Sequence, residues 1–249
     1  MKQDKIYIYG KHALTEALKN SPQSIKKVFL ASEEDKALVS LLAKHNIAYG
    51  KLGKGELAGD VNENATHQGV IGLISLDRLV ISYEQFIKNL QVTKDTSLVI
   101  MGELQDPHNV GAIIRSAAAF GVSGVLMPEH NQAPITGAVV KVSAGMAFRI
   151  PIVRIGNINT VIRDLKDRGF WIYGLDGEAK TSIVDEQFDA PTAFILGNEA
   201  KGIREKTAEL CDIMLSIPMH PQCESMNVAS STSVALYAWS AKHPDALKG

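Results

Sequence analysis

Short apolar segments alternate with amphipathic helical patterns in the first 75 residues. Four segments have the length and composition of β-strands, namely residues 4–10, 25–31, 47–52 and 69–76. The spacing of apolar residues between them predicts helices over residues 11–20 and 35–46 and a short helix over residues 54–61. Strands that alternate with helices indicate an α/β unit.

The same alternation resumes at Leu98 with longer apolar runs. The predicted strands are residues 97–104, 122–128, 150–155, 170–176, 192–199 and 213–219. The predicted helices are residues 109–120, 158–168, 203–211 and 230–243. Nearly continuous apolar strands joined by crossover helices are typical of a parallel sheet. In such sheets, ligands bind at the carboxyl ends of the strands.

Residues 77–95 are more polar and contain one modest helical pattern. We therefore expect two α/β domains, at residues 1–76 and 96–249, with residues 77–95 as the linker between them. No stretch rich in glycine, serine or proline marks this boundary.

Composition excludes several classes of protein. Of the 249 residues, 45% are hydrophobic and 21% are charged, as expected for globular domains with a core. The net charge of −1 gives no overall basic excess for nucleic acid, although a local basic patch remains possible. No apolar run has the length of a membrane helix, and the first residues lack the apolar region of a signal peptide. We expect a cytoplasmic protein.

Most common motifs of catalysis are missing from the sequence. It contains no GxGxxG after a strand, no HExxH and no metal-like spacing of His and Cys, and its two cysteines do not suggest a disulfide framework. The segment GLDGEAKT, residues 174–181, is similar to a phosphate-binding loop. Ala179 replaces its second glycine, and a β-carbon there would obstruct the wrapping of the backbone around a phosphate.

The segment QDPHNVGAIIRSAAAFG, residues 105–121, begins a helix with an unusual arginine. Asp106 is the expected N-cap and Pro107 the first helical residue. Arg115 shares a face with small residues, although the helix dipole opposes a cation near the helix start. That face consists of Ala112, Ser116, Ala118 and Ala119.

Two later segments also place polar residues directly after predicted strands. The first is GNEAKG, residues 197–202, and the second follows Ile217-Pro218-Met219 with Ser225-Met226-Asn227-Val228. Structural roles fit each polar residue: Asn109 as a cap or turn, Glu199 as an acid at a helix start, and Ser225 or Asn227 as the N-cap of the last helix.

Together, the three segments resemble the SpoU/TrmH-type members of the SPOUT superfamily of RNA methyltransferases. The family's first motif corresponds to Asp106-Pro107-His108-Asn109-Val110-Gly111 and continues to Arg115, and the other two motifs are the segments above, in family order. Met226 stands where leucine is usual, and Ala229-Ser230-Ser231 stands where a Ser-Val-Ala type of sequence is usual.

The N-terminal part extends the resemblance. The segments YGKHALTEALKN and THQGVIGLI resemble the two ends of the RNA substrate-binding domain, similar to ribosomal protein L30e, of a bacterial 23S rRNA methyltransferase in this family. The resemblance therefore implies an enzyme that methylates the ribose 2′-hydroxyl of a guanosine in 23S rRNA. Within that domain, Lys26, Lys27, Lys51 and Lys54 are candidates for phosphate contacts or for a merely solvated face.

The resemblance also implies the cofactor, the fold and the roles of the motif residues. The cofactor is S-adenosylmethionine, and the C-terminal SPOUT domain carries a trefoil knot. The helix with Arg115 contributes to a homodimer interface, and the alternative is that its small residues pack within one subunit. The implied catalytic residues are Asn109, Arg115, Glu199, Ser225 and Asn227, and the implied cofactor-binding residues are Gly197, Asn198, Ile217 and Met226.

Two alternative functions remain open from the sequence. One is a transfer RNA ribose methyltransferase, which would use the same chemistry on another RNA. The other is a non-catalytic RNA-binding protein that uses the L30e-like unit. Because arginine is a very poor base, we expect Arg115 to stabilise negative charge or to position a phosphate rather than to remove a proton by itself.

Overall fold

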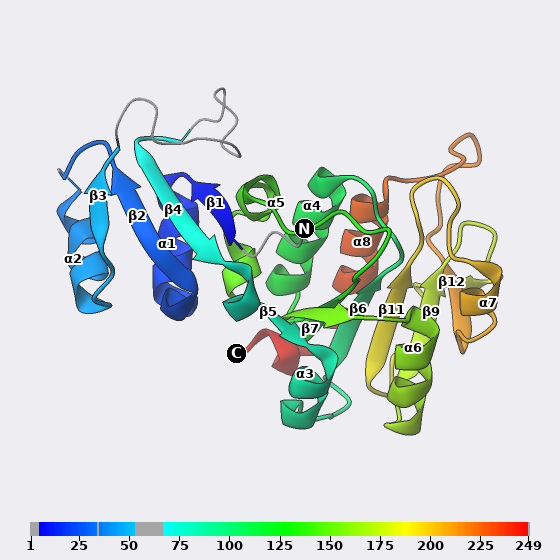
Figure 1. The fold of residues 1–249 in the computed structure, drawn as a ribbon. Helices are drawn as coiled ribbons and strands as arrows, with labels where there is room; N and C mark the ends of the chain where they lie inside the picture. Colours follow the sequence, from blue (N-terminus) through cyan, green and yellow to red (C-terminus); the bar gives the residue numbers. More distant parts are fainter. Residues whose placement is uncertain (1–4, 34, 53–66, 249) are drawn as a thin grey trace.

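The computed structural model describes residues 5–33, 35–52 and 67–248 (Figure 1). Within these ranges the strands form two sheets, one from each part of the chain. The N-terminal sheet has four strands in the order β1-β4-β2-β3. The larger sheet has eight strands in the order β10-β12-β9-β11-β6-β7-β8-β5. The predicted α/β fold is therefore confirmed.

The N-terminal sheet is covered by helices on one face. Its elements are β1 (Lys5–Tyr9), α1 (Lys11–Asn20), β2 (Ile25–Leu30), α2 (Lys36–Lys44), β3 (Tyr49–Lys51) and β4 (Val70–Ser75). Ile8, Val28 and Leu30 share a core with Leu14 of α1 and Leu38 of α2. Because successive side chains of a strand point to opposite faces, every second side chain of β1 and β2 points toward these helices.

The larger sheet is parallel at each pairing of its described strands. Its strands are β5 (Val80–Ser82), β6 (Ser97–Met101), β7 (Gly124–Pro128), β8 (Ile152–Ile155), β9 (Trp171–Leu175), β10 (Thr181–Ser182), β11 (Thr192–Leu196) and β12 (Ile213–Ser216). Every residue of β6, β7 and β11 is buried, which explains their continuous apolar runs.

Helices cover both faces of this sheet (Figure 1). Its helices are α3 (Tyr83–Asn89), α4 (Pro107–Ala119), α5 (Gly137–Val142), α6 (Ile158–Asp167), α7 (Glu205–Ala208) and α8 (Val228–Ser240). Val99 of β6 packs in the core that includes α4 and α8, whereas Leu98 packs in the core that includes α3 and α6. Among the described residues, no helix has the length and apolar character needed to cross a lipid bilayer.

Helix α4 begins as its sequence predicts. The Asp106 carboxylate accepts a hydrogen bond of 2.8 Å from the backbone N–H of His108, and Pro107 occupies the first turn. Ile113 and Ala117 are fully buried, and Arg115 is exposed. The last helix starts at Val228, two residues before the predicted start, because Asn227 serves as its N-cap.

The predicted linker contains two regular elements. β5 pairs with β8, and α3 buries Phe86, whose ring lies against Gly124 of β7. Residues 80–89 therefore pack in the layers of the larger sheet. A three-residue strand and a seven-residue helix are too short to produce a clear periodic pattern. The division of the chain into two domains stays a prediction.

Other short elements also differ from the prediction. α5 and β10 were not expected, and only residues 205–208 of the helix predicted over residues 203–211 form α7. Six, two and four residues respectively are below the length at which apolar periodicity is informative. The short helix predicted over residues 54–61 lies outside the described residues.

The two sheets are joined by close packing. α5 packs against β1, and a β-carbon on Gly137 would lie only 2.1 Å from the backbone oxygen of Tyr7. Glu16 of α1 is buried, and its carboxylate accepts hydrogen bonds from Arg149 Nε and from Asn20 Nδ2. Because a buried carboxylate needs such partners, Glu16 and Arg149 hold the N-terminal unit in one position against the larger sheet.

We predict that Glu16→Gln destabilises the protein at neutral pH but not in acid. The hydrogen bond from Arg149 lowers the pKa of Glu16, and this outweighs the opposing effect of burial. The resulting stability is present above the ordinary glutamate pKa of about 4.3 and is lost as the pH falls through the lower pKa of the folded state. Urea unfolding should show a loss of about 1–3 kcal/mol at pH 7.

The exposed residue Glu209 provides the control. Glu209→Gln should change the free energy of unfolding little at any pH. A difference between wild type and Glu16→Gln that stays constant as the pH falls below about 4 would contradict the prediction.

Candidate active site

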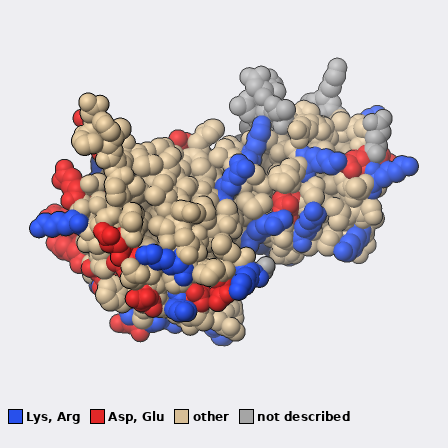
Figure 2. Space-filling view, turned by 180° about the vertical axis from the view of Figure 1, so that it is seen from behind, with Lys and Arg blue, Asp and Glu red and all other residues tan. Residues whose placement is uncertain are grey.

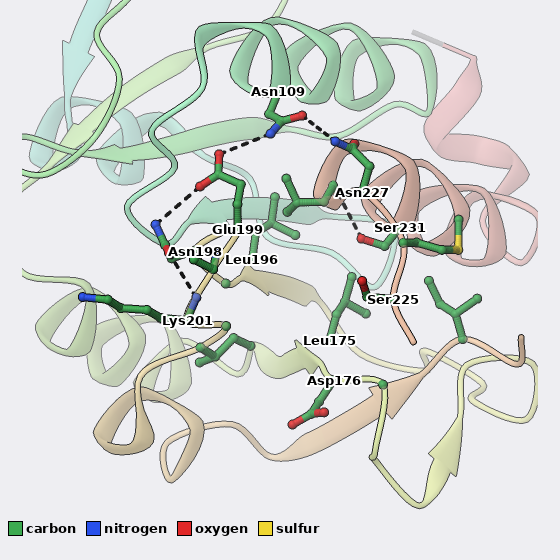
Figure 3. Close-up of a pocket in the computed structure, with 18 of the residues that line it drawn as sticks. Asn109, Leu175, Asp176, Leu196, Asn198, Glu199, Lys201, Ser225, Asn227 and Ser231 are labelled. Atoms are coloured by element: carbon green, nitrogen blue, oxygen red, sulfur yellow. Dashed lines mark hydrogen bonds between the residues drawn. The ribbon is translucent and has the colours of Figure 1, made fainter. Parts of the chain in front are cut away.

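An open cleft of about 1000 Å³ lies at the carboxyl ends of the central strands (Figure 3). Its lining residues fall within four segments, residues 105–109, 175–177, 196–203 and 215–231. These segments follow β6, β9, β11 and β12, which are neighbours in the sheet. This is the edge at which ligands bind in parallel α/β proteins.

The loop after β11 is a tight turn held by its own backbone. Asn198 and Gly202 exchange two backbone hydrogen bonds of 3.0 and 2.9 Å. The Asn198 side chain accepts hydrogen bonds from the N–H groups of Ala200 and Lys201 and donates one to the backbone oxygen of Glu103. A β-carbon on Gly197 would lie 2.4 Å from the carbonyl carbon of Gly202, so this turn requires glycine there.

The Glu199 carboxylate binds the start of α4. It accepts hydrogen bonds of 3.2 Å from the backbone N–H groups of Gln105 and Asp106 and from Asn109 Nδ2. Burial would raise the pKa of Glu199, but these donors and its own N–H lower it below the ordinary value. Glu199 is thus an anion at a helix N-terminus, and the helix is α4, 90 residues earlier in the chain.

Asn109 links Glu199 to the third motif through hydrogen bonds. Its Oδ1 accepts a hydrogen bond of 2.9 Å from Asn227 Nδ2. Asn227 Oδ1 in turn accepts from the N–H groups of Ala229 and Ser230 and thereby caps α8. Figure 3 shows Glu199, Asn109 and Asn227 in one row along the cleft. We call these three residues the Asn–Glu–Asn chain.

Eight of the nine predicted site residues line this one cleft, and Arg115 does not. The three members of the Asn–Glu–Asn chain use their polar atoms on one another and on the backbone, so their contacts are those of positioning residues. Ser225 and Met226 are exposed at the cleft, and Ile217 is partly buried. The catalytic and cofactor-binding roles of these residues stay predictions.

Arg115 lies on an exposed part of α4, and its guanidinium has no hydrogen-bond or ion-pair partner within the described ranges. Part of the small-residue face beside it packs inside the subunit. Ala112 packs against the core, and Ser116 Oγ lies 2.7 Å from Ser233 Oγ of α8. Ala119 remains exposed.

Sequence reasoning missed three charged residues of the cleft, Asp176, Glu224 and Lys201. Asp176 follows β9 directly, so the same signal of a polar residue after a strand was available for it. Together with Asp106 and Glu199, the acidic residues of the lining outnumber its one lysine. Within the described ranges, no group of three or more His, Cys, Asp or Glu is placed to hold a metal ion.

Two family models match the chain in succession. Residues 7–79 match the model "RNA 2'-O ribose methyltransferase substrate binding", and residues 96–237 match the model "SpoU rRNA Methylase family". The second match covers more than half of the chain and contains all nine predicted site residues.

Curated relatives match over almost the whole chain. The 23S rRNA (guanosine-2'-O-)-methyltransferase RlmB of Haemophilus ducreyi is 35% identical over 92% of this chain and 95% of its own length. The protein of the same name from Xanthomonas axonopodis pv. citri is 34% identical over 95% of this chain and 96% of its own length.

Solved structures share the fold. The SpoU methyltransferase AviRb from Streptomyces viridochromogenes, in complex with AdoMet, has a TM-score of 0.81 at 21% identity and covers 97% of this chain and 92% of its own. An AdoMet-bound rRNA methyltransferase from Sinorhizobium meliloti has a TM-score of 0.77 at 20% identity over 96% of this chain and 87% of its own. The family model and the curated relatives together show that the chain belongs to the SpoU rRNA methylase family.

Proposed function

We propose that this protein transfers a methyl group from S-adenosylmethionine to the ribose 2′-hydroxyl of a guanosine in 23S rRNA, in the cytoplasm. The observation that carries the proposal is the Asn–Glu–Asn chain, which joins the three family motifs around one cleft. The names of the curated relatives support the choice of reaction and of RNA.

The cleft suits S-adenosylmethionine in shape and charge. Gly197, Asn198, Ile217 and Met226 border it and offer backbone groups to an adenosine. The carboxylates of Asp176 and Glu224 favour the positive charge of a sulfonium and an ammonium group. When bound, S-adenosylmethionine supplies a methyl group on a positively charged sulfur. The trefoil knot of the family stays a prediction for this chain.

The chain's own residues must orient a ribose hydroxyl and stabilise it as its proton leaves. Glu199 is poorly suited to remove that proton, because its donors lower its pKa and occupy its oxygens. The Asn–Glu–Asn chain instead fixes the loops that border the reacting groups. Ser225, whose hydroxyl is exposed at the cleft, is available to contact the ribose. A guanidinium can stabilise the charge that develops on the oxygen.

That guanidinium comes from the partner subunit of a homodimer. Arg115 does not line its own cleft, and it is exposed on α4, the helix whose Ser116 and Phe120 contact α8. Tyr237 and Val234 of α8 are 63% and 36% exposed, and the Tyr237 ring packs edge-on against Phe120 at 6.1 Å. Exposed apolar side chains on α8, together with an unpaired cation on the adjacent helix α4, favour a second copy that brings Arg115 to the neighbouring cleft.

Lysines on the N-terminal unit support an RNA partner. Lys26, Lys27 and Lys51 are exposed there, and Lys54 lies outside the described residues. Figure 2 shows from behind that Lys and Arg side chains also spread over the N-terminal unit and its junction with the larger sheet. A balanced total charge therefore conceals basic surface that can contact phosphates.

The two alternatives are less well supported. The A. aeolicus TrmH/SpoU tRNA modifying enzyme covers 62% of this chain with a TM-score of 0.54, whereas the two rRNA relatives named above cover 95% and 92% of it. A protein that only binds RNA would not need the joined motif loops or the acidic cleft.

We predict labelled methyl transfer from S-adenosylmethionine to 23S rRNA but not to transfer RNA. The label should be at a ribose 2′-hydroxyl, because a 2′-O-methyl group makes the adjacent phosphodiester resistant to alkaline cleavage. Nuclease mapping by mass spectrometry identifies the nucleotide. Protein-free rRNA and ribosomal precursors should be tested in parallel. Label in transfer RNA alone would favour the first alternative, and binding of rRNA without any transfer would favour the second.

We predict that Gly197→Ala weakens binding of S-adenosylmethionine by about tenfold or more, about 1.4 kcal/mol, because its β-carbon displaces the turn after β11. Gly177→Ala is the matched control. Gly177 lines the same cleft, but a β-carbon there would lie 4.0 Å from the nearest atom, the backbone oxygen of Glu224. Calorimetry should find normal binding for the control only. If both variants bind S-adenosylmethionine normally, the turn after β11 is not part of the cofactor site.

We predict that Arg115→Ala folds and binds cofactor normally but transfers methyl groups about 100-fold more slowly in single turnovers. Arg115→Lys should recover little activity, since an ammonium lacks the planar donor fork of a guanidinium. If Arg115 acts across the dimer, subunits of Arg115→Ala mixed with subunits of Gly197→Ala should regain activity, because one cleft in the mixed dimer is intact. A wild-type rate for Arg115→Ala would refute the role, and mixtures as inactive as their parts would place the arginine in its own cleft.

A further inference from the structure

The N-terminal sheet has one face that α1 and α2 leave uncovered, and α5 contacts this face at its β1 edge, beside Tyr9. α1 and α2 pack on the other face, where Ile8 and Val28 point. In Figure 1 these two helices lie behind the sheet. The face turned away from them carries the alternate side chains of β1, β4 and β2.

That uncovered face is aromatic. Strand register places Ile71 of β4 between Tyr9 of β1 and Phe29 of β2. The neighbouring row runs from Tyr7 through Leu73 to Lys27. Ile71 is fully buried, whereas Tyr7, Tyr9 and Phe29 are partly exposed. We call the three rings, with Lys27, the aromatic face.

Lysine ammonium groups flank these rings. Lys27 Nζ lies 4.8 Å from the centre of the Phe29 ring, and Lys141 Nζ, from α5, lies 5.7 Å from the centre of the Tyr9 ring. Both lysines are exposed, as is Lys5 at the start of β1. Asp77, which follows β4, accepts a hydrogen bond from Ser75 Oγ. The face therefore combines flat apolar rings with positive charge.

We propose that the aromatic face binds unpaired RNA bases, which stack on Tyr7 and Phe29 while Lys27 and Lys141 contact the adjacent phosphates. Bases have flat apolar surfaces and a negatively charged backbone, so they match both properties of the face. A duplex hides its bases and would leave the rings unused. This inference rests on the proposed function, since it specifies how the substrate RNA is held.

The spacing of the rings fits a short single strand. β1 and β2 are separated by β4, and Tyr7 and Phe29 lie in neighbouring rows, so these two rings are two strand spacings apart across the sheet, about 10 Å, and two residues apart along it, about 7 Å. A sheet with aromatic rings at such spacing can stack two or three bases. Tyr9 also packs against Gly137 of α5, so bases at this edge would lie next to the larger sheet.

The test compares the affinity of ring-removal variants for single-stranded RNA. Tyr7→Leu and Phe29→Leu keep an apolar side chain in the strand but remove the ring. With a fluorescent, unstructured RNA of about ten nucleotides, each should bind about tenfold more weakly than wild type in anisotropy titrations. Lys27→Ala should also reduce the slope of log affinity against log salt by about 0.7.

Tyr49→Leu is the matched control, because it removes a tyrosine of the same sheet that is paired with Val28 and lies toward the helices. Its affinity for RNA should equal that of wild type. All variants should keep wild-type calorimetric binding of S-adenosylmethionine, which verifies that the cleft and the fold are intact.

The outcomes separate this inference from the proposed function. If wild type neither binds nor methylates rRNA, the proposed function fails. If wild type does both and the ring-removal variants bind single strands normally, only the aromatic face is refuted. Equal weakening toward a duplex of the same sequence would also refute stacking. Weaker binding to ribosomal particles, with normal binding to protein-free RNA, would assign the face to a protein and overturn the proposal.

Discussion

The hydrogen bonds among Glu199, Asn109 and Asn227 connect parts of the chain that folding must bring together from far apart. Glu199 follows β11, Asn109 lies in the first turns of α4, and Asn227 precedes α8. Asn109 is buried, and a buried polar group is costly to leave without partners. Its partners Glu199 and Asn227 also bind backbone N–H groups, so the three loops that border the cleft are joined to one another.

The structural and functional interpretations of these residues are therefore compatible. Asn227 caps α8 with Oδ1 and binds Asn109 with Nδ2. Glu199 is the anion at the start of a helix, as the structural interpretation supposed, but the helix is α4. Residues of this kind can be indispensable to an active site without touching the reacting atoms, since they determine where the backbone groups and Ser225 point.

The sequence predicted local features well and long-range ones poorly. The capped start of α4 and the parallel sheet could be predicted, because caps and strand runs are local signals, and eight of the nine site residues implied by the family resemblance lie at the cleft. The bond from Glu199 to α4 could not be predicted, since periodicity carries no information on which loops meet. Short elements such as β5 and α5 lacked enough residues to show a period. Tyr7 and Phe29 were predicted within strands, but apolar rings on alternate positions do not reveal which face lacks a helix.

Two glycines connect the N-terminal unit to the cleft. A β-carbon on Gly111, the glycine of the first motif, would lie 2.7 Å from the Val142 side chain and 2.9 Å from the Val139 oxygen of α5. α5 in turn approaches β1 closely at Gly137. One continuous set of contacts thus runs from Asn109 and Arg115 on α4, through α5, to the strand that carries Tyr7. Close-packed contacts of this kind are hard to compress, so they keep the two parts at a nearly constant distance. The first motif therefore contains residues at the cleft, an arginine, and Gly111, whose contact with α5 sets the distance from the cleft to the N-terminal sheet. RNA held on that sheet would meet the cleft at a fixed separation.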